Sequence, residues 1–187
     1  MKQVPRLVLI VAAVAAVSAC ASSADASNVK APPSPSSVAA QSHIAPMNPC
    51  TLVTASDASK AAGRTLVNDV LLGASPVAGG CFYGAKGTSS GVYVYMQVYP
   101  DSATAGAVTA EQLESVMSGQ LGSVTGEAKQ VDGIGDKAIE LTAKGKAGSG
   151  IGIVVYRSNV VFIVAVTPTT NAGNVEALAK TAVGRLH

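Results

Sequence analysis

Residues 160–167 constrain the fold more than any other stretch of this chain, because they are apolar on both faces of a strand. Their sequence, VVFIVAVT, has no polar side chain before its last position. A strand points successive side chains to opposite faces of its sheet, so a strand of this composition has to be covered on both sides. We therefore predict a central strand in a sheet that carries packed layers.

The neighbouring segments predict the rest of an α+β fold. Residues 91–99 alternate aliphatic side chains with Tyr93, Tyr95 and Tyr99, which is the period of an amphipathic strand. Further strands are expected at 65–72, 80–85, 127–131, 137–142 and 150–156, and helices at 55–62, 104–121 and 171–186. The order α-β-β-β-α-β-β-β/β-α predicts a mainly antiparallel, curved sheet with helices packed on it, and a weak α-β-β-β internal repeat.

The first twenty residues have the order of an export signal. Lys2 and Arg6 precede an apolar run, 7–17, that is too short to span a bilayer comfortably. Val17-Ser18-Ala19-Cys20 then resembles a bacterial lipobox, which implies cleavage before Cys20 and acyl chains such as palmitate on the new N-terminal residue. The alternatives are an ordinary secretory signal cut nearby and an uncleaved anchor. We expect a lipid-anchored protein on the extracytoplasmic side of the cell membrane, in the cell envelope.

The chain after the signal divides into a tether and a domain. Residues 21–48 are rich in Ala, Ser and Pro without apolar periodicity, which predicts a disordered tether, and 49–187 is long enough for a single globular domain. Of 13 basic and 11 acidic residues, Lys2 and Arg6 leave with the signal, so the mature protein is neutral. A neutral domain gives no reason to expect nucleic-acid binding, and the expected link to the bilayer is the acylated Cys20.

The cysteine count predicts one disulfide. Cys20 is consumed by the lipid, which leaves Cys50 and Cys81 as an even pair in an oxidising compartment. The alternative is two free buried thiols.

The residues around this pair resemble a known family. Pro49-Cys50-Thr51-Leu52-Val53-Thr54 leads into a short Ala-rich helix that Thr54 and Asp57 can cap and Gly63 can end. Gly79-Gly80-Cys81-Phe82-Tyr83 and the turn at 131–138 follow. Together they resemble small lipoproteins of high-GC Gram-positive (actinobacterial) bacteria that share a domain of unknown function. The resemblance implies a location and an architecture, and it implies no chemistry.

Catalytic patterns are weak in this sequence. Residues 87–91 fit G-x-S-x-G, but the pattern needs a following helix and a histidine base, and the two histidines are His43 in the predicted tether and His187 at the C-terminus. Asp132, Asp136 and Glu140 lack the spacing of a calcium loop. We therefore expect neither a catalytic residue nor a metal or other cofactor.

The strongest candidate for a binding surface is a row of tyrosines. Tyr93, Tyr95 and Tyr99 share one face of their strand, and Tyr83 from the neighbouring strand is expected to join them. Rigid amphipathic rings suit the binding of an apolar ligand or an envelope partner protein. The alternative is that the row lies beneath a helix as core.

Three functions remain open from the sequence. The first is a non-enzymatic binding module of the envelope that uses the tyrosine face. The second is a hydrolase that acts on envelope material through a pair drawn from Glu111, Glu114 and Glu140, although nothing in the sequence brings two of them together. The third is a purely structural envelope protein.

Overall fold

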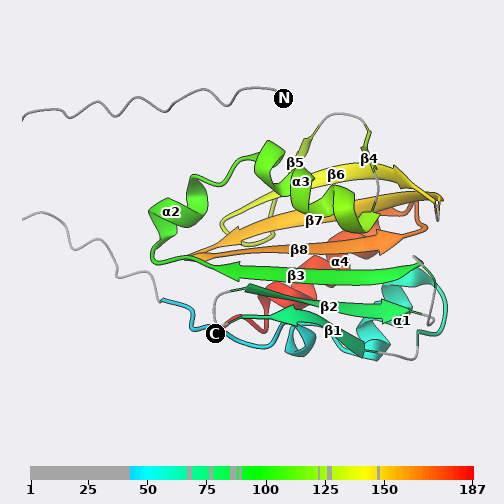
Figure 1. Cartoon of the computed structure of the whole chain (residues 1–187), viewed down its shortest axis with the longest axis horizontal. Coiled ribbons are helices and arrows are strands. Elements are labelled where there is room, and N and C mark those ends of the chain that lie inside the picture. Colours follow the sequence, from blue (N-terminus) through cyan, green and yellow to red (C-terminus); the bar gives the residue numbers. More distant parts are fainter. Residues whose placement is uncertain are drawn as a thin grey trace, which may run out of the picture. The chain divides into compact units, whose positions relative to one another are not determined.

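The computed structural model describes residues 43–66, 69–75, 78–84, 88, 90–121, 123–125, 128–146 and 148–187. These residues form an α+β fold with a curved, open antiparallel sheet and helices on both faces, as the sequence predicts (Figure 1). The signal, Cys20 and the tether up to residue 42 lie outside the described residues. Within the described ranges, no helix has the length and apolar character needed to cross a membrane.

The described strands form one sheet in the order β1-β2-β3-β8-β7-β6-β4, and β5 also pairs with β6. All of these pairings are antiparallel. The strands are β1 (Asp69–Ala74), β2 (Ala78–Gly84), β3 (Gly91–Val98), β4 (Ser123–Val124), β5 (Lys129–Val131), β6 (Lys137–Gly145), β7 (Gly148–Arg157) and β8 (Val160–Thr167).

Strand β8 occupies the centre of the sheet, which confirms the prediction made from its composition. Every residue from Val160 to Thr167 is buried, and β8 pairs with β3 on one side and β7 on the other. Burial of these apolar side chains on two faces stabilises the fold by roughly 1.5 to 3 kcal/mol for each large residue. The largest of them, Phe162, is completely buried.

The side chains of β8 divide between two cores because strand residues alternate. Val160, Phe162, Val164 and Val166 face a core covered by α1 (Ala55–Ala62) and α4 (Ala172–Val183), which we call the α1/α4 face. Val161, Ile163 and Ala165 face α2 (Ser102–Gly106) and α3 (Ala110–Leu121), which we call the α2/α3 face. The sheet is therefore the middle layer of a three-layer domain (Figure 1).

The two helices of the α1/α4 face follow the predicted patterns. The Thr54 hydroxyl accepts a hydrogen bond from the Asp57 amide, the Asp57 carboxylate accepts one from the Thr54 amide, and Gly63 ends α1 at a φ of 65°. This is the expected capping box with a left-handed glycine cap. In α4 the buried side chains recur at helical spacing, namely Val175, Leu178, Ala179 and Ala182.

The predicted helix at 104–121 is wrong in one respect, because the segment forms two helices, α2 and α3. Asp101 caps α2. Thr109 and Gln112 cap α3, because the Thr109 amide donates to the Gln112 side chain and the Gln112 amide donates to the Thr109 hydroxyl. The Tyr156 hydroxyl donates to the Val108 carbonyl between the helices at 2.9 Å. Local capping and one tertiary hydrogen bond therefore divide the segment.

The strand bounds differ from prediction mainly at the first edge of the sheet. Strand β1 begins at Asp69 rather than residue 65, and the short strand β4 was not expected. The strands β1-β2-β3 and β6-β7-β8 form two antiparallel meanders that meet at β3 and β8. The helices before them, α1 and α3, pack on opposite faces, so the predicted α-β-β-β repeat does not extend to its helices.

The folded domain begins earlier than the predicted boundary at Pro49. Ile44 is 4% exposed within the core of the α1/α4 face, although we assigned it to the tether. The buried Asn159 side chain accepts from the Ile44 amide at 2.8 Å and donates to the Ile44 carbonyl at 3.1 Å. His43, which falls within the predicted tether, lies 3.2 Å from the same side chain through Nε2. The domain therefore includes at least residues 43–48.

Candidate functional site

Three aromatic side chains of β2 and β3 lie together on the α2/α3 face. Phe82 and Tyr93 are direct cross-strand partners with ring centroids 4.5 Å apart, and Tyr95 follows two positions along β3. We call Phe82, Tyr93 and Tyr95 the aromatic shelf. All three are partly exposed, and no described helix covers β2 and β3 on this face (Figure 1). Tyr93, Tyr95 and Tyr99 are each partly buried against the core of the α2/α3 face, so the described residues lie between the two predicted arrangements, an exposed row and a row beneath a helix.

The Phe82 ring lies close against the backbone of its neighbours. Gly84 and Gly91 face each other across β2 and β3, and a Cβ atom at either position would collide with this ring. The missing side chains allow the ring to lie down on the sheet, which is the arrangement by which an aromatic residue covers a glycine in a strand. The shelf is thus ordered by its own strands before any ligand binds.

Tyr99 continues the row at the end of β3, and Tyr156 joins it from β7. Both contribute to the core of the α2/α3 face, and Gln97 lies between Tyr95 and Tyr99. Burial raises the pKa of Tyr99, and the neighbouring Tyr95 phenol raises it further. Burial likewise raises the pKa of Tyr156, with a smaller contribution from Tyr99. These phenols therefore stay neutral, and the nearest charge to them in the described contacts is the Lys137 ammonium, 5.0 Å from the centroid of the Tyr156 ring.

Tyr156 and Phe82 were missed in the sequence. Tyr156 lies near the end of β7, which reaches β3 only through the pairing of both strands with β8, so sequence spacing does not place it beside Tyr99. Phe82 could have been considered from the sequence, because it is adjacent to Tyr83. Successive strand residues face opposite sides, so only one of these two aromatic residues can join the tyrosines of β3.

Tyr83 lies on the other face of the sheet, contrary to prediction. It pairs with Val92 of β3, is 1% exposed, and belongs to the core of the α1/α4 face. Its hydroxyl contacts the carbonyls of Cys50, at 3.1 Å, and Val53. A shift of one residue moves a strand side chain to the opposite face, and Tyr83 consequently holds the segment before α1 rather than a ligand.

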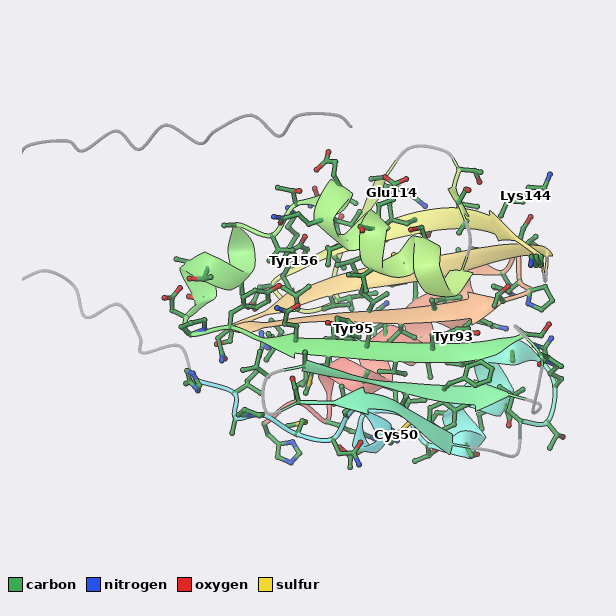
Figure 2. The ribbon with its side chains drawn as sticks, in the orientation of Figure 1. Cys50, Tyr93, Tyr95, Glu114, Lys144 and Tyr156 are labelled. Carbon is green, nitrogen blue, oxygen red and sulfur yellow. A yellow bond between two sulfur atoms is a disulfide. The ribbon has the colours of Figure 1, made fainter. Side chains whose placement is uncertain are left out.

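Helix α3 forms a wall beside the aromatic shelf. Leu113 and Met117 face the sheet and are buried, whereas Val116 is 38% exposed and is the only large apolar side chain exposed to this extent among the described residues. Successive helix residues are 100° apart, which puts Val116 and Glu114 on opposite flanks of α3. Glu114 points away from β3 (Figure 2), so Val116 lies on the flank towards the shelf.

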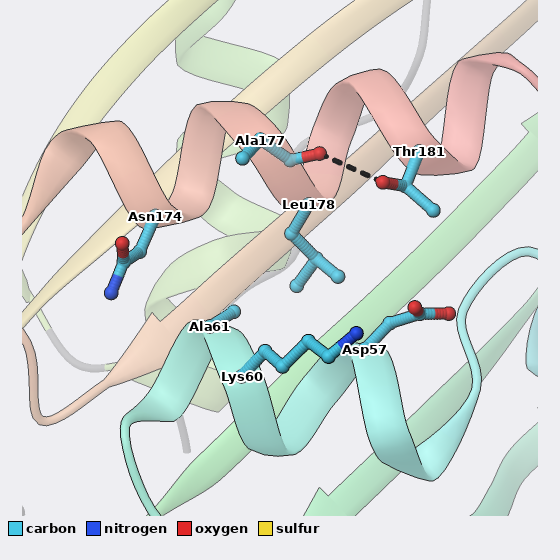
Figure 3. A pocket seen from close by; sticks show the side chains of 7 residues that line it. All are labelled: Asp57, Lys60, Ala61, Asn174, Ala177, Leu178 and Thr181. Carbon is cyan, nitrogen blue, oxygen red and sulfur yellow. Dashed lines mark hydrogen bonds between the residues drawn. The ribbon is translucent and has the colours of Figure 1, made fainter.

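A hollow on the other face of the sheet lies between α1 and α4 (Figure 3). It is lined by Asp57, Lys60, Ala61, Asn174, Ala177, Leu178 and Thr181. Its volume is about 200 Å³, which is below the ~300 to 1,000 Å³ common for ligand pockets. The Thr181 hydroxyl donates to the Ala177 carbonyl at 3.0 Å, and the Asp57 carboxylate is engaged by Thr54 and Arg185. The hollow is a packing groove between helices and not the best candidate site.

Asp57, which lines this groove, is expected to make the stability of the domain depend on pH. Partial burial alone would raise the pKa of its carboxyl group, but hydrogen bonds from Thr54 and the ion pair with Arg185, 2.8 Å away, outweigh burial and lower the pKa to about 2. A lowered folded-state pKa contributes stability above the unfolded value of 3.8 that is lost as the pH falls towards 2. We expect Asp57→Asn to lower the free energy of unfolding by about 1 to 2 kcal/mol at pH 7.

Urea unfolding at pH 7, 4 and 2 measures this effect. The difference between wild type and Asp57→Asn should shrink between pH 4 and pH 2. Asp132→Asn is the matched control, because it makes the same change at an exposed turn position. A difference that stayed constant down to pH 2 would contradict the assigned linkage.

Among the acidic residues considered for hydrolysis, Glu140 lies apart from Glu111 and Glu114, which are three positions apart on one helix. Glu111 and Glu114 are exposed on α3, which covers the α2/α3 face. Glu140 shares the strand parity of Ala138, so it faces the α1/α4 side of β6. No group of three His, Cys, Asp or Glu side chains that could hold a metal ion occurs in the part of the chain that the structure describes.

The aromatic shelf with its α3 wall is the best candidate site on this domain. The sequence located its tyrosines on β3, and the structure adds Phe82, Tyr156 and Val116 and removes Tyr83. The resemblance to actinobacterial lipoproteins stays a prediction. No protein family model, curated protein or solved structure matches this chain.

Proposed function

We propose that this protein is a lipid-anchored lipoprotein of the cell envelope whose domain is a non-enzymatic binding module for an apolar ligand. The observation that supports the binding role is the aromatic shelf of Phe82, Tyr93 and Tyr95. These rings are partly exposed while the neighbouring half of the same sheet face is covered by α2 and α3. Rings of this kind present a large, rigid apolar area at little cost in conformational entropy.

The chemistry around the shelf favours an apolar ligand. The described β2 and β3 residues on this face carry no charge; they are Ala78, Gly80, Phe82, Gly84, Gly91, Tyr93, Tyr95 and Gln97. The α3 wall adds the exposed Val116. Ligand sites are typically lined by apolar and aromatic groups with a few polar groups for orientation, and the tyrosine hydroxyls and Gln97 supply those here.

Binding of N-phenyl-1-naphthylamine, which fluoresces in apolar sites, tests the binding role. Tyr95→Ala and Phe82→Ala are expected to weaken its binding at least 10-fold, since each removes a ring of the shelf. Tyr83→Phe is the matched control, because it changes a buried tyrosine on the opposite face and costs about 1 kcal/mol of stability without touching the shelf.

Equal affinities in wild type, Tyr95→Ala and Phe82→Ala would contradict the proposal. Crosslinking in cells followed by mass spectrometry covers the other class of occupant. If no probe binds but Tyr95→Ala removes a crosslinked protein, then the shelf binds a partner protein and the apolar-ligand proposal is wrong.

The lipid anchor rests on the lipobox Val17-Ser18-Ala19-Cys20 alone. We expect cells fed a palmitate analogue to label the protein, and Cys20→Ala to remove the label and release the protein from the membrane fraction. Cys50→Ala is the control and should keep the label, because that residue lies outside the lipobox. Labelling that survived Cys20→Ala would exclude the proposed anchor.

A further inference from the structure

The α2/α3 face has a floor almost without side chains next to the aromatic shelf. Four small or short residues face this side of the sheet, because alternate residues of a strand share a face with Val154 of β7 and Ile163 of β8. They are Gly150 and Gly152 of β7 and Ala165 and Thr167 of β8. A Cβ atom placed on Gly152 would lie 3.6 Å from Ala165 Cβ, and one on Gly150 would lie 3.1 Å from Thr167 Cβ. We call these four residues the trough.

The trough lies between the aromatic shelf and helix α3. Tyr93 pairs with Ala165, and Gly91 pairs with Thr167, so the shelf strand borders one side. On the other side the Met117 side chain of α3 reaches down to Gly152, where an added Cβ would collide with its terminal methyl group. Methionine is flexible and adapts its shape to irregular apolar space. The trough is therefore closed by a side chain that can move.

A buried hydroxyl at one end of the trough has no hydrogen-bond partner in the part of the chain that the structure describes. This is Oγ1 of Thr167, a residue that is 2% exposed. A Cβ atom added to Gly150 would lie 3.4 Å from this oxygen, so the hydroxyl lies beside the glycines of the trough. An unpaired buried hydroxyl costs free energy, and such groups in native structures call for an explanation. A ligand polar atom would satisfy it.

We propose that the trough binds the chain of a neutral single-chain amphiphile, with the polar end hydrogen-bonded to Thr167 and the chain leaving along the aromatic shelf. The proposal rests on the binding function assigned to that shelf. A neutral end is favoured over a carboxylate, because a buried charge needs a charged or multiply bonded partner. The Arg64 guanidinium, which reaches this strand end, donates to the Thr167 carbonyl at 3.0 Å rather than to the hydroxyl.

Displacement of N-phenyl-1-naphthylamine from the purified protein by decanol, decanoate and decane tests the proposal. Decanol is expected to displace the probe at lower concentration than either analogue. Thr167→Val should lower the affinity for decanol about 5- to 10-fold, since valine keeps the shape of threonine and lacks the hydroxyl. Thr142→Val, at an exposed position of β6, is the matched control and should leave the affinity unchanged.

Two further measurements guard against loss of folding as the cause. Thr167→Val is expected to raise the melting temperature of the ligand-free protein by about 2 to 5 °C, because an unpaired polar atom is removed. Met117→Ala should tighten decanol binding several-fold, since it empties the trough, and misfolding would not produce such a gain. A lower melting temperature in Thr167→Val, or no gain in Met117→Ala, would overturn the assignment.

The outcomes separate this inference from the proposed function. If the probe binds and Tyr95→Ala weakens it, but decanol does not displace it or Thr167→Val leaves decanol unaffected, then the trough assignment fails and the shelf stands. Preference for decanoate over decanol would also overturn it, by showing a charged end. If neither probe nor decanol binds, the apolar-ligand function itself fails.

Discussion

Removal of the Cys50–Cys81 disulfide is expected to lower the free energy of unfolding by about 3 to 4 kcal/mol. The bond joins residues 31 apart in sequence, which connects the turn η1 (Pro49–Thr51) to the middle of β2. On the chain-entropy model, closing a loop of this length removes about that much freedom from the unfolded chain. Urea unfolding of Cys50→Ser/Cys81→Ser, and of wild type with and without reductant, measures the loss.

The protein should remain folded at 25 °C without this bond, because other contacts hold the same segment. The Tyr83 hydroxyl contacts the carbonyls of Cys50 and Val53, and Arg185 donates to the Leu52 carbonyl at 2.9 Å. Cys20→Ser is the matched control and should unfold at the wild-type urea concentration, because Cys20 lies outside the closed loop. A loss below 1 kcal/mol in the double variant would contradict the assigned contribution.

The layered architecture could be predicted from sequence because its strongest signals are local. Residues 160–167 are apolar on both faces, and the structure places them at the centre of the sheet with the predicted bounds. The cap of α1 also follows from nearby residues, since Thr54 and Asp57 satisfy each other's amides. Hydrophobic alternation and capping each depend on a few neighbouring residues, so one sequence is enough to reveal them.

The candidate site was predicted less well because it depends on register and distant packing. The tyrosine row of β3 is correct, but its β2 neighbour is Phe82 and not Tyr83, and a one-residue choice decides the face. Tyr156 and Thr167 reach the same face only through pairings of β7 and β8 with β3. Ile44 resembles a linker residue until Asn159, 115 positions later, is seen to bond its backbone.

Substitution of Asn159 by alanine is expected to cost about 2 to 4 kcal/mol of stability. This side chain is 1% exposed, accepts from the Ile44 amide, and donates to the carbonyls of Ile44 and Tyr99, each at 3.1 Å. Alanine would leave these buried backbone groups unpaired, and each such group carries a desolvation penalty of roughly 1 to 3 kcal/mol before relaxation. Urea unfolding gives the total, and limited proteolysis shows whether residues 43–48 become accessible.

Asn159→Asp separates the hydrogen bonds from the shape of the side chain. Aspartate has the size of asparagine and can still accept from the Ile44 amide, but an ionised carboxylate donates nothing to the Ile44 and Tyr99 carbonyls and adds a buried charge. It should therefore destabilise the domain at pH 7 at least as much as alanine. Asn174→Ala, at an exposed position of α4, is the control and should change stability by less than about 0.5 kcal/mol. If Asn159→Asp kept wild-type stability, the donated bonds would not be what holds residues 43–48 to the domain.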